Sequence, residues 1–387
     1  MIYLDNAATT RAHENVVRDM LPYLYGEYGN PSTLYGLGRK AESAIQKARQ
    51  QVATFLHTTP DHIVFTSGGS EGNNMVIKGL VEHLQKTGRK TVVFSPTEHP
   101  SVLRNVDYLI KCGFYVRYLP VSTQGIVELD EVDNYISDDV GFMSVMYVNN
   151  ETGAINPIKE IAEKCHNCGI LLHSDCVQAA AAFDVNVADL NVDFATMSAH
   201  KIHGPKGVGA VYIRDPELNL LDPLVIGGEE QEGGLRGGTE NVAGIVGFGT
   251  ACTVMEKPLD IRAPFLYELS EALNKLESQH HIYINSSDNA VGNILNIEIE
   301  GVDAETLILM MDQMGVCISA GSACHSKNVE SSHVLKAMGL SDVEARSSVR
   351  ISSSSYQTEK DIIEAAHIMA ECIDRLDHIE DYTGTPT

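Results

Sequence analysis

Short apolar runs without polar alternation recur through the first two-thirds of the chain, and a helical pattern of apolar residues follows most of them. The runs are residues 63–66, 91–94, 143–148, 170–173, 194–197 and 210–213. A strand that is apolar on both faces is typical of a sheet covered by helices on both sides. Strands that alternate with helices form mostly parallel sheets. The sequence therefore predicts an α/β domain built on a mostly parallel sheet.

The pattern changes near Pro258, after a glycine-rich stretch over residues 227–244. Beyond it, short strand patterns mix with helical ones, which is typical of an α+β unit. A chain of 387 residues is also long for a single compact core. We predict a large α/β domain over residues 15–258, and a smaller α+β domain formed by residues 1–14 together with 259–387.

The composition excludes several classes of function. The formal net charge is −24, and such a field repels a phosphate backbone, so we expect no nucleic-acid partner. No apolar run approaches the roughly 20 residues that span a bilayer, and the N-terminus lacks the basic start and apolar core of a signal peptide. Eight cysteines without a secretory signal favour reduced thiols over disulfides. We therefore expect a cytoplasmic protein with no membrane partner.

Lys201 is the first candidate for chemistry. Ligands of parallel α/β sheets bind beyond the carboxyl ends of the strands. Lys201 follows the run 194–197 as part of Ser-Ala-His-Lys, and a Gly-Pro-Lys-Gly turn comes next. An amine that is desolvated in this position has a lowered pKa and can form a Schiff base. On this motif alone, the alternative is a loop lysine beside two ordinary histidines, His200 and His203.

Asp175 follows the run 170–173 in the same way. A carboxylate there can pair with a protonated pyridine nitrogen, which is how proteins make pyridoxal phosphate (PLP) an electron sink. Gln178 lies within reach of the same ligand. Taken alone, Asp175 is equally consistent with a helix N-cap.

Residues 68–72, Gly-Gly-Ser-Glu-Gly, join a strand pattern to a helical one. Glycines allow close approach, and the helix N-terminus supplies N–H groups for a phosphate, here together with Ser70. The turn lacks the Gly-Lys-Ser/Thr of a Walker A loop and the Gly-x-Gly-x-x-Gly of a dinucleotide site. His99 follows the run 91–94, and its ring can stack on a flat ligand or shuttle protons. The alternative for His99 is a surface loop histidine.

Five longer motifs accompany these candidates. They are Leu-Asp-Asn-Ala-Ala-Thr-Thr from Leu4, Gly-Asn-Pro-Ser from Gly29, Asn-Asn-Glu-Thr-Gly from Asn149, Ser-Ala-His-Lys from Ser198 and Arg-Gly-Gly-Thr from Arg236. With them the chain resembles, from Tyr3 to its last helix, the cysteine desulfurases of the NifS/IscS type, which are fold-type I PLP enzymes of the class V aminotransferase family. The resemblance implies a PLP-dependent sulfurtransferase with a mostly parallel seven-stranded sheet.

The resemblance also implies a role for each candidate. Lys201 would hold PLP through its amine and later move the Cα proton, Asp175 would face the ring nitrogen, and Gln178 would face the ring hydroxyl. His99 would stack on the ring as part of the catalytic set. The phosphate would be bound by Gly69, Ser70, Ser198, His200 and, from the partner subunit of a homodimer, Thr239. Asn150 would contact both cofactor and substrate, and Arg350 and Asn6 would help to orient the substrate, L-cysteine.

Cys324 stands in a run of small residues, Ser-Ala-Gly-Ser-Ala-Cys-His-Ser over residues 319–326. Low bulk predicts a mobile loop that carries a thiol to and from a buried substrate. By the resemblance, Cys324 takes the sulfur of L-cysteine as a persulfide and leaves L-alanine. The sulfur then passes to an acceptor such as an iron–sulfur scaffold, for cluster assembly. We expect no resident metal, with Cys324 at most a transient ligand of an iron–sulfur cluster.

Two alternative functions stay open. A selenocysteine lyase or another PLP β-lyase would release selenide or sulfide without needing Cys324. A non-catalytic iron–sulfur or metal carrier would use Cys165, Cys168 and Cys324, although no second Cys/His pair follows the first two at finger distance. Cys176 is interpreted as packing near the cofactor. The sulfur acceptor also stays open among an iron–sulfur scaffold, nitrogenase-type assembly and tRNA thiolation.

Overall fold

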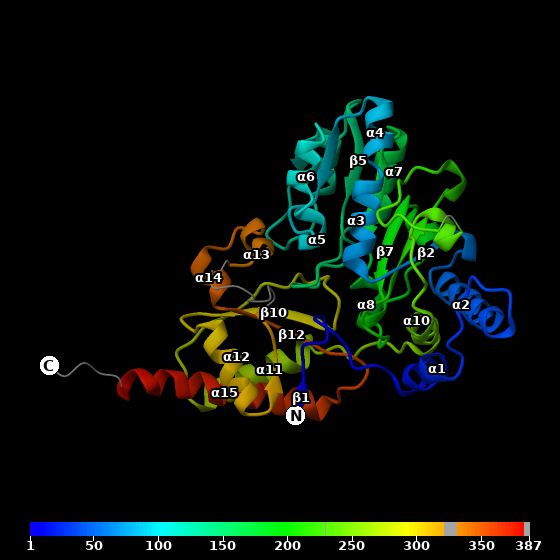
Figure 1. Cartoon of the computed structure of the whole chain (residues 1–387). Helices are drawn as coiled ribbons and strands as arrows, with labels where there is room; N and C mark the ends of the chain where they lie inside the picture. Colours follow the sequence, from blue (N-terminus) through cyan, green and yellow to red (C-terminus); the bar gives the residue numbers. More distant parts are fainter. Residues whose placement is uncertain (229, 321–330, 383–387) are drawn as a thin grey trace.

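A computed structural model describes residues 1–228, 230–320 and 331–382 (Figure 1). Its larger part is built on a seven-stranded sheet with the order β2-β8-β7-β6-β5-β3-β4. The strands are β2 (Ile63–Thr66), β3 (Thr91–Phe94), β4 (Tyr115–Tyr118), β5 (Val140–Ser144), β6 (Leu171–Asp175), β7 (Phe194–Ser198) and β8 (Gly209–Ile213). All neighbours from β7 to β4 pair in parallel, whereas β8 runs antiparallel to β2 and β7. The expected α/β class and mostly parallel seven-stranded sheet are confirmed.

Both faces of this sheet are buried, because successive strand residues enter two different cores. In β3, Val93 packs into the core that contains helix α2 (Gly36–Phe55), whereas Val92 packs into the core that contains α3 (Gly69–Gly79). Figure 1 shows helices on both sides of the sheet. Each large apolar side chain buried in this way stabilises the fold by about 1.5–3 kcal/mol. This two-sided burial explains why the strands lack polar alternation.

Two details of the strand prediction are wrong. The edge strand β4 is missing from the predicted runs, because most of its side chains are exposed and Arg117 interrupts the apolar pattern. The strand expected over residues 143–148 is β5, which ends at Ser144. The apolar residues Val145 and Met146 lie in the following loop and are buried there. A buried loop therefore accounts for the overlong apolar run.

A second group of elements forms around a three-stranded antiparallel sheet with the order β12-β10-β9. Its elements are β9 (Ile282–Ile284), β10 (Ile294–Ile299), β12 (Ser348–Ser352), α11 (Arg262–Lys275), α12 (Ala304–Gln313) and α15 (Glu359–Tyr382). Their apolar side chains share one core with Ile2 and Leu4. The division into domains at residues 14 and 258 stays a prediction.

The remaining helical elements connect these parts. They are α1 (Glu14–Tyr25), α4 (Val81–Thr87), α5 (Pro100–Leu103), α6 (Val106–Lys111), α7 (Ile158–Asn167), α8 (Ala179–Ala182), α9 (Val187–Leu190), α10 (Val242–Val254), α13 (His333–Ala337), α14 (Asp342–Arg346) and the 3-10 turns η1 (Pro60–His62), η2 (Leu129–Tyr135), η3 (Ala199–Lys201), η4 (Pro216–Leu218) and η5 (Gln231–Gly234). Within the described ranges, no helix combines the length and apolarity needed to cross a bilayer.

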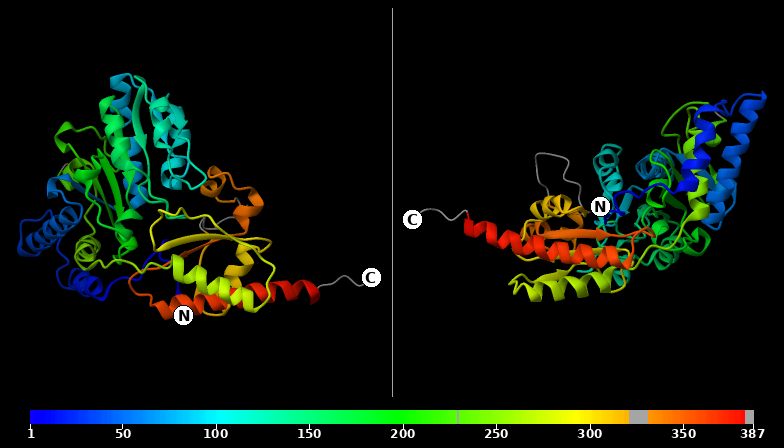
Figure 2. Two further views of the ribbon diagram at one scale, coloured as in Figure 1. Left: turned by 180° about the vertical axis from the view of Figure 1, so that it is seen from behind. Right: turned by 90° about the horizontal axis from the view of Figure 1, so that it is seen from below.

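The N-terminal segment runs from the smaller sheet to the carboxyl edge of the larger one. Strand β1 (Ile2–Tyr3) pairs in parallel with β11 (Val316–Cys317). Farther along, the Thr10 backbone N–H donates to the His200 carbonyl at 2.9 Å. Figure 2 shows this blue segment leading from the smaller group toward α1, which lies beside the larger one. The segment therefore borders the edge at which the candidate residues lie.

Gly72 lies where α3 packs on the sheet, and we expect Gly72→Ala to destabilise the protein. A Cβ at this position would lie 2.7 Å from Thr196 Cγ2 and 3.0 Å from Val211 Cγ2. Overpacking of this kind costs about 1–3 kcal/mol, which urea denaturation followed by circular dichroism measures. In the control Gly36→Ala, the new methyl meets no atom within 4 Å, so the unfolding midpoint should not fall. Equal losses in both variants would contradict the close packing of α3.

Candidate active site

The candidate residues gather at one edge of the seven-stranded sheet. Asp175 is the last residue of β6, Ser198 is the last of β7, and Lys201 ends η3, which follows β7. His99 precedes α5 beyond β3, and Gly69 begins α3 beyond β2. Because these strands point in the same direction, their carboxyl ends meet at one edge, where such sheets bind ligands.

The Lys201 amine is partly buried and lies against the N-terminal segment. Its Nζ donates to the Ala7 carbonyl at 2.5 Å and to the Ala8 carbonyl at 2.8 Å. Gln178 Nε2 donates to the same Ala7 carbonyl at 2.8 Å, so the two side chains are neighbours. Burial, together with the positive charge of Arg350, lowers the pKa of Lys201 to about 8. The amine therefore reaches the neutral state that a Schiff-base nucleophile needs at a lower pH than an ordinary lysine does.

Asp175 is buried, with one neutral donor on each carboxylate oxygen. Asn73 Nδ2 donates to Oδ2 at 2.7 Å, and the Val177 backbone N–H donates to Oδ1 at 3.0 Å. An ionised carboxylate has about four acceptor positions, so capacity remains for a protonated ring nitrogen. The N-cap position of α8 belongs to Gln178, which sets aside the alternative of Asp175 as the cap of that helix.

His99 is the N-cap of α5. Its Nδ1 accepts a hydrogen bond from the Ser101 backbone N–H at 3.1 Å and lies 2.7 Å from the Ser101 hydroxyl. Burial lowers the pKa of His99, and the negative charge of Asp175 opposes this only in part. The ring is therefore neutral at pH 7 and suited to packing against a flat ligand.

The first turn of α3 forms the other end of the site. Gly68 has a φ of +153°, which L side chains rarely adopt, and a Cβ on Gly69 would meet Val177 Cγ2 at 2.9 Å. Glycine at both positions lets the free N–H groups of the helix start lie beside the ends of β6 and β7, where they can bind an anion. Ser70 is exposed in this turn, and Ser198 is buried.

His200 and Thr239, the other expected phosphate ligands, lie in different surroundings. His200 Nδ1 lies 3.1 Å from Thr9 Oγ1. Burial, together with the charges of Lys201 and Lys206, lowers the pKa of His200 to about 4. His200 therefore offers an anion a hydrogen bond and no charge. Thr239 is exposed in this single chain, on the loop before α10.

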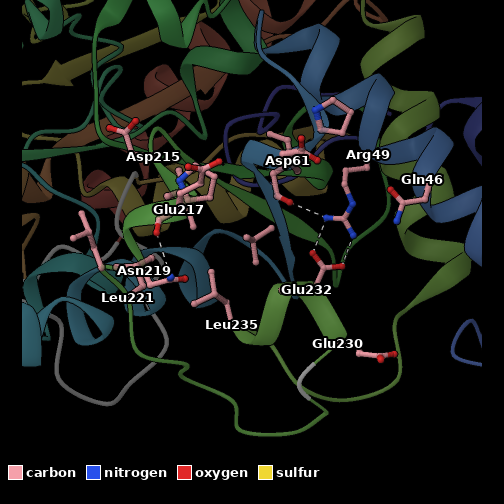
Figure 3. Close-up of a pocket in the computed structure, with 17 residues that line it drawn as sticks. Gln46, Arg49, Asp61, Asp215, Glu217, Asn219, Leu221, Glu230, Glu232 and Leu235 are labelled. Atoms are coloured by element: carbon pink, nitrogen blue, oxygen red, sulfur yellow. Dashed lines mark hydrogen bonds and ion pairs between the residues drawn. The ribbon is translucent and has the colours of Figure 1, made fainter.

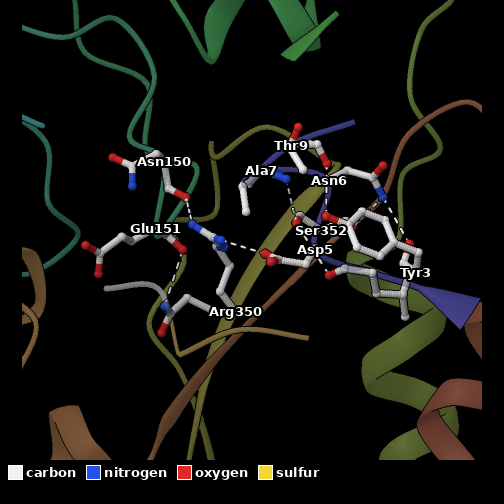
Figure 4. A network of polar contacts seen from close by, with 12 residues as sticks. Tyr3, Asp5, Asn6, Ala7, Thr9, Asn150, Glu151, Arg350 and Ser352 are labelled. Carbon is white, nitrogen blue, oxygen red and sulfur yellow. Dashed lines mark hydrogen bonds and ion pairs between the residues drawn. The ribbon is translucent and has the colours of Figure 1, made fainter. Parts of the chain in front are cut away.

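Arg350 lies in β12 and reaches toward the N-terminal segment (Figure 4). Its Nη1 donates to the Asn150 carbonyl at 2.8 Å, and its Nη2 pairs with Asp5 Oδ1 at 2.7 Å. Its Nε is buried and has no hydrogen-bond partner among the described residues. A guanidinium with an unused buried N–H can still donate a hydrogen bond to the carboxylate of a ligand.

The two asparagines expected at the substrate differ in position. Asn6 Nδ2 donates to three acceptors, among them the Ser352 carbonyl at 3.0 Å. Its amide nitrogen therefore pins the N-terminal segment to β12. The Asn150 side chain points away from the Arg350 guanidinium in Figure 4, and the two residues meet through the Asn150 carbonyl.

Sequence reasoning missed four polar residues that complete the site. They are Asp5, Asn73, Glu98 and Ser101. Glu98 is fully buried, and burial, followed by the negative charge of Asp175, raises the pKa of Glu98 to about 8. Each of the four stands within or beside a motif that the sequence analysis singled out.

The expected sulfur acceptor, Cys324, lies outside the described residues. The cysteines within them are free thiols. Burial raises the pKa of Cys165 and of Cys176 to about 12, so both behave as packing residues. Cys168 is exposed whereas Cys165 is buried, and the described part of the chain contains no group of three or more metal-binding side chains. The structure therefore lends no support to a metal carrier built on these two thiols.

A hollow at the other end of β2 holds a second charged cluster (Figure 3). Arg49 donates to both carboxylate oxygens of Glu232, at 2.7 and 2.8 Å, and to the Ile63 carbonyl at 2.7 Å. Glu232 also accepts from the Phe65 backbone N–H at 2.7 Å. Because these buried groups satisfy one another, we interpret the pair as structural.

The candidate residues suit a ligand with an anionic group, a flat ring that contains a basic nitrogen, and an aldehyde. The start of α3 suits the anion, the Asp175 carboxylate suits the ring nitrogen, and the Lys201 amine, with its lowered pKa, suits the aldehyde. PLP has these three features. The donor set therefore fits that cofactor.

Comparison with known proteins finds a matching family model, similar sequences and similar solved structures. The family model for aminotransferase class-V matches residues 2–364. Cysteine desulfurase IscS of Dictyoglomus turgidum is 38% identical over 384 residues, which cover 98% of this chain and 96% of the relative. Among solved structures, a NifS-like protein has a TM-score of 0.85 at 31% identity and covers 98% of this chain and 99% of its own. A structure described as SspA in complex with cysteine has a TM-score of 0.82 at 34% identity, with 92% and 100% covered.

These matches cover nearly all of this chain and nearly all of each relative, so the similarity concerns the complete fold. They confirm the resemblance drawn from the motifs, the fold-type I architecture and the use of PLP. The chain belongs to the class-V aminotransferase family and, within it, to the NifS/IscS type of cysteine desulfurases.

Proposed function

We propose that this protein is a PLP-dependent cysteine desulfurase that moves the sulfur of L-cysteine onto Cys324 and releases L-alanine. One observation carries the proposal: a lysine amine with a lowered pKa and a buried carboxylate, Lys201 and Asp175, lie at the same sheet edge. The relatives named cysteine desulfurase, and the neighbour solved with cysteine, support the choice of substrate.

The cofactor would be held at four points: its aldehyde, ring nitrogen, ring hydroxyl and phosphate. Lys201 would bind its aldehyde, Asp175 its ring nitrogen, and Gln178 its ring hydroxyl, with the His99 ring alongside. Gly69, Ser70, Ser198 and His200 would bind the phosphate, joined by Thr239 of the partner subunit in a homodimer. When bound, PLP supplies an electron sink for the pair of electrons that a departing Cα proton leaves behind.

Lys201 would also be the base. When it is not bonded to the cofactor, the Lys201 amine would take the Cα proton of the bound substrate. A pKa of about 8 suits this task, because a base with a pKa near the working pH combines a large unprotonated fraction with enough basicity.

Arg350 would orient the substrate through its carboxylate. Two of its nitrogens are held by Asp5 and the Asn150 carbonyl, and Nε is left without a partner among the described residues. The held nitrogens fix the guanidinium plane, so the remaining donor has a defined direction. Asn150, which belongs to the same contact, and Asn6 would complete this end of the site.

Cys324 would accept the sulfur as a thiolate. Its sulfur attacks the sulfur of the substrate, so a sulfur–sulfur bond forms while the bond from Cβ to sulfur breaks. The electron pair of the broken bond stays with the carbon skeleton, which leaves as alanine after protonation. The persulfide then passes to an acceptor, for which an iron–sulfur scaffold is our choice because the relatives carry the name IscS. We place this work in the cytoplasm, where the free thiols of the described cysteines stay reduced.

The alternative function is a selenocysteine lyase or another PLP β-lyase. Such an enzyme would use the same Lys201 and Asp175 but would release the chalcogen directly. The small-residue motif around Cys324 favours the desulfurase.

The pH dependence of cofactor capture tests the role of Lys201. Only a neutral amine attacks an aldehyde, so capture of PLP by cofactor-free protein should speed up with pH and level off above about pH 8. A lysine with an ordinary pKa would keep gaining up to about pH 10.4. Borohydride trapping at set times, followed by peptide mapping, measures the rate and locates the pyridoxyl group. Lys206 is exposed nearby, so Lys206→Ala is the control and should keep the profile. A steady climb to pH 10, or label on Lys206, would refute the assignment.

The fate of the sulfur tests the role of Cys324. We expect Cys324→Ala to bind L-cysteine and change the cofactor spectrum, since Lys201 and Asp175 are untouched, but to lose alanine formation by roughly two orders of magnitude or more. Mass spectrometry of alkylated wild-type protein should find one extra sulfur on the peptide that contains Cys324. The matched control is Cys317→Ala, which should keep wild-type turnover. Alanine formation at the wild-type rate by Cys324→Ala would favour the lyase instead.

A further inference from the structure

Four side chains form a hydrogen-bonded chain from the end of β6, across α3, to the start of α5. Asn73 Nδ2 donates to Asp175 Oδ2 at 2.7 Å and to Ser101 Oγ at 2.9 Å. Ser101 Oγ lies 2.7 Å from His99 Nδ1. The chain thus joins the residue assigned to the ring nitrogen with the residue assigned to the ring face.

The direction of the first links follows from Asp175. An ionised carboxylate can only accept hydrogen bonds, so the Asn73 amide must turn its nitrogen toward Asp175. The same nitrogen then donates to the Ser101 hydroxyl. In this orientation Asn73 Oδ1 is buried and has no partner in the part of the chain that the structure describes. A buried oxygen without a hydrogen-bond partner is uncommon. Here the amide leaves its oxygen unpaired because both of its N–H groups point at acceptors, Asp175 and Ser101.

The direction of the last link follows from Ser101. Its hydroxyl oxygen accepts from Asn73, so its proton is free to point at His99 Nδ1. The Ser101 backbone N–H, which can only donate, also points at His99 Nδ1, at 3.1 Å. Two donors therefore meet on one ring nitrogen, and that nitrogen carries no proton.

We propose that Asn73 and Ser101 are positioning residues that hold His99 in the tautomer with its proton on Nε2. This inference rests on the proposed function, in which His99 lies alongside the cofactor. A ring in this state donates a hydrogen bond from Nε2, but it has no free nitrogen with which to take up a proton. The proton that leaves Cα therefore goes to Lys201, and His99 contributes a fixed N–H donor.

Burial and the charges that face His99 act on its pKa in opposite directions. Asp175 on β6 favours a protonated imidazole, whereas burial, Lys201 on η3 and His333 on α13 oppose it. Without the donors on Nδ1, a histidine so close to a carboxylate could take up a second proton on that nitrogen. Asn73 and Ser101 make the same carboxylate the anchor of a chain that directs two donors at Nδ1, which adds to the effect of burial.

The test is nitrogen-15 NMR of the cofactor-loaded protein with labelled histidine, recorded across pH and assigned with His99→Gln. In the wild type, His99 should show an unprotonated Nδ1 and a protonated Nε2 at neutral pH. Ser101→Ala removes one donor from Nδ1, and Asn73→Ala lets the Ser101 hydroxyl turn round and accept. Hydrogen bonds to the neutral form disfavour the charged form, so each variant should raise the proton affinity of His99 by about tenfold, one pKa unit.

Asn105→Ala is the matched control. Asn105 is a buried asparagine that donates to the Ser101 carbonyl at 2.7 Å and so contacts Ser101 away from its hydroxyl. This variant should lose stability and keep the wild-type His99 titration. A proton on Nδ1 in the wild type would overturn the proposal, as would Asn73→Ala and Ser101→Ala titrating like Asn105→Ala. These readings need no turnover, whereas alanine formation from L-cysteine by the wild type tests the proposed function separately.

Discussion

The Lys201 amine depends on a stretch of backbone from the beginning of the chain. The Ala7 and Ala8 carbonyls accept its N–H groups, and the segment that carries them is fixed at one end by β11 and at the other by the His200 carbonyl. Removing an amine from water costs free energy unless its donors are satisfied. Neutral carbonyls satisfy the donors without supplying a negative charge, so the pKa of Lys201 is free to fall. A carboxylate in their place would keep the lysine charged and unreactive.

The residues around Lys201 also limit the net charge of the site. Asp175 receives neutral donors from Asn73 and Val177, whereas Asp5 faces the charged Arg350. Glu98, whose pKa is raised to about 8, is mostly protonated at pH 7 and adds little negative charge next to Asp175. The site thus holds a lysine with a lowered pKa, Lys201, beside the buried carboxylate of Asp175. Environments that push neighbouring groups to different protonation states are the usual mark of acid–base chemistry.

Patterns that are local in the sequence predicted most of the fold. Two-sided apolar runs indicated the parallel sheet, and the turns that follow them indicated where Lys201, Asp175 and His99 would lie. The exposed strand β4 was missed because an edge strand has no two-sided apolar pattern, and the strand at 143–148 was misplaced because a buried loop is as apolar as a strand. The supporting contacts were beyond reach for a different reason. Asn73 meets Asp175 across 102 positions, and Asp5 meets Arg350 across 345, and no local pattern encodes such pairs.

In the proposed reaction, the sulfur of L-cysteine stays on the protein. The most direct measurement is a rapid-quench time course of alanine and free sulfide, with excess L-cysteine and neither a reductant nor a sulfur acceptor. We expect a burst of about one alanine per chain, because a thiol that has taken one sulfur atom cannot accept the next until it is unloaded. Free sulfide should stay far below alanine during the burst, and both should rise together faster once a stronger thiol reductant is added. Steady release of equal alanine and sulfide from the first turnover, with no burst, would contradict the account.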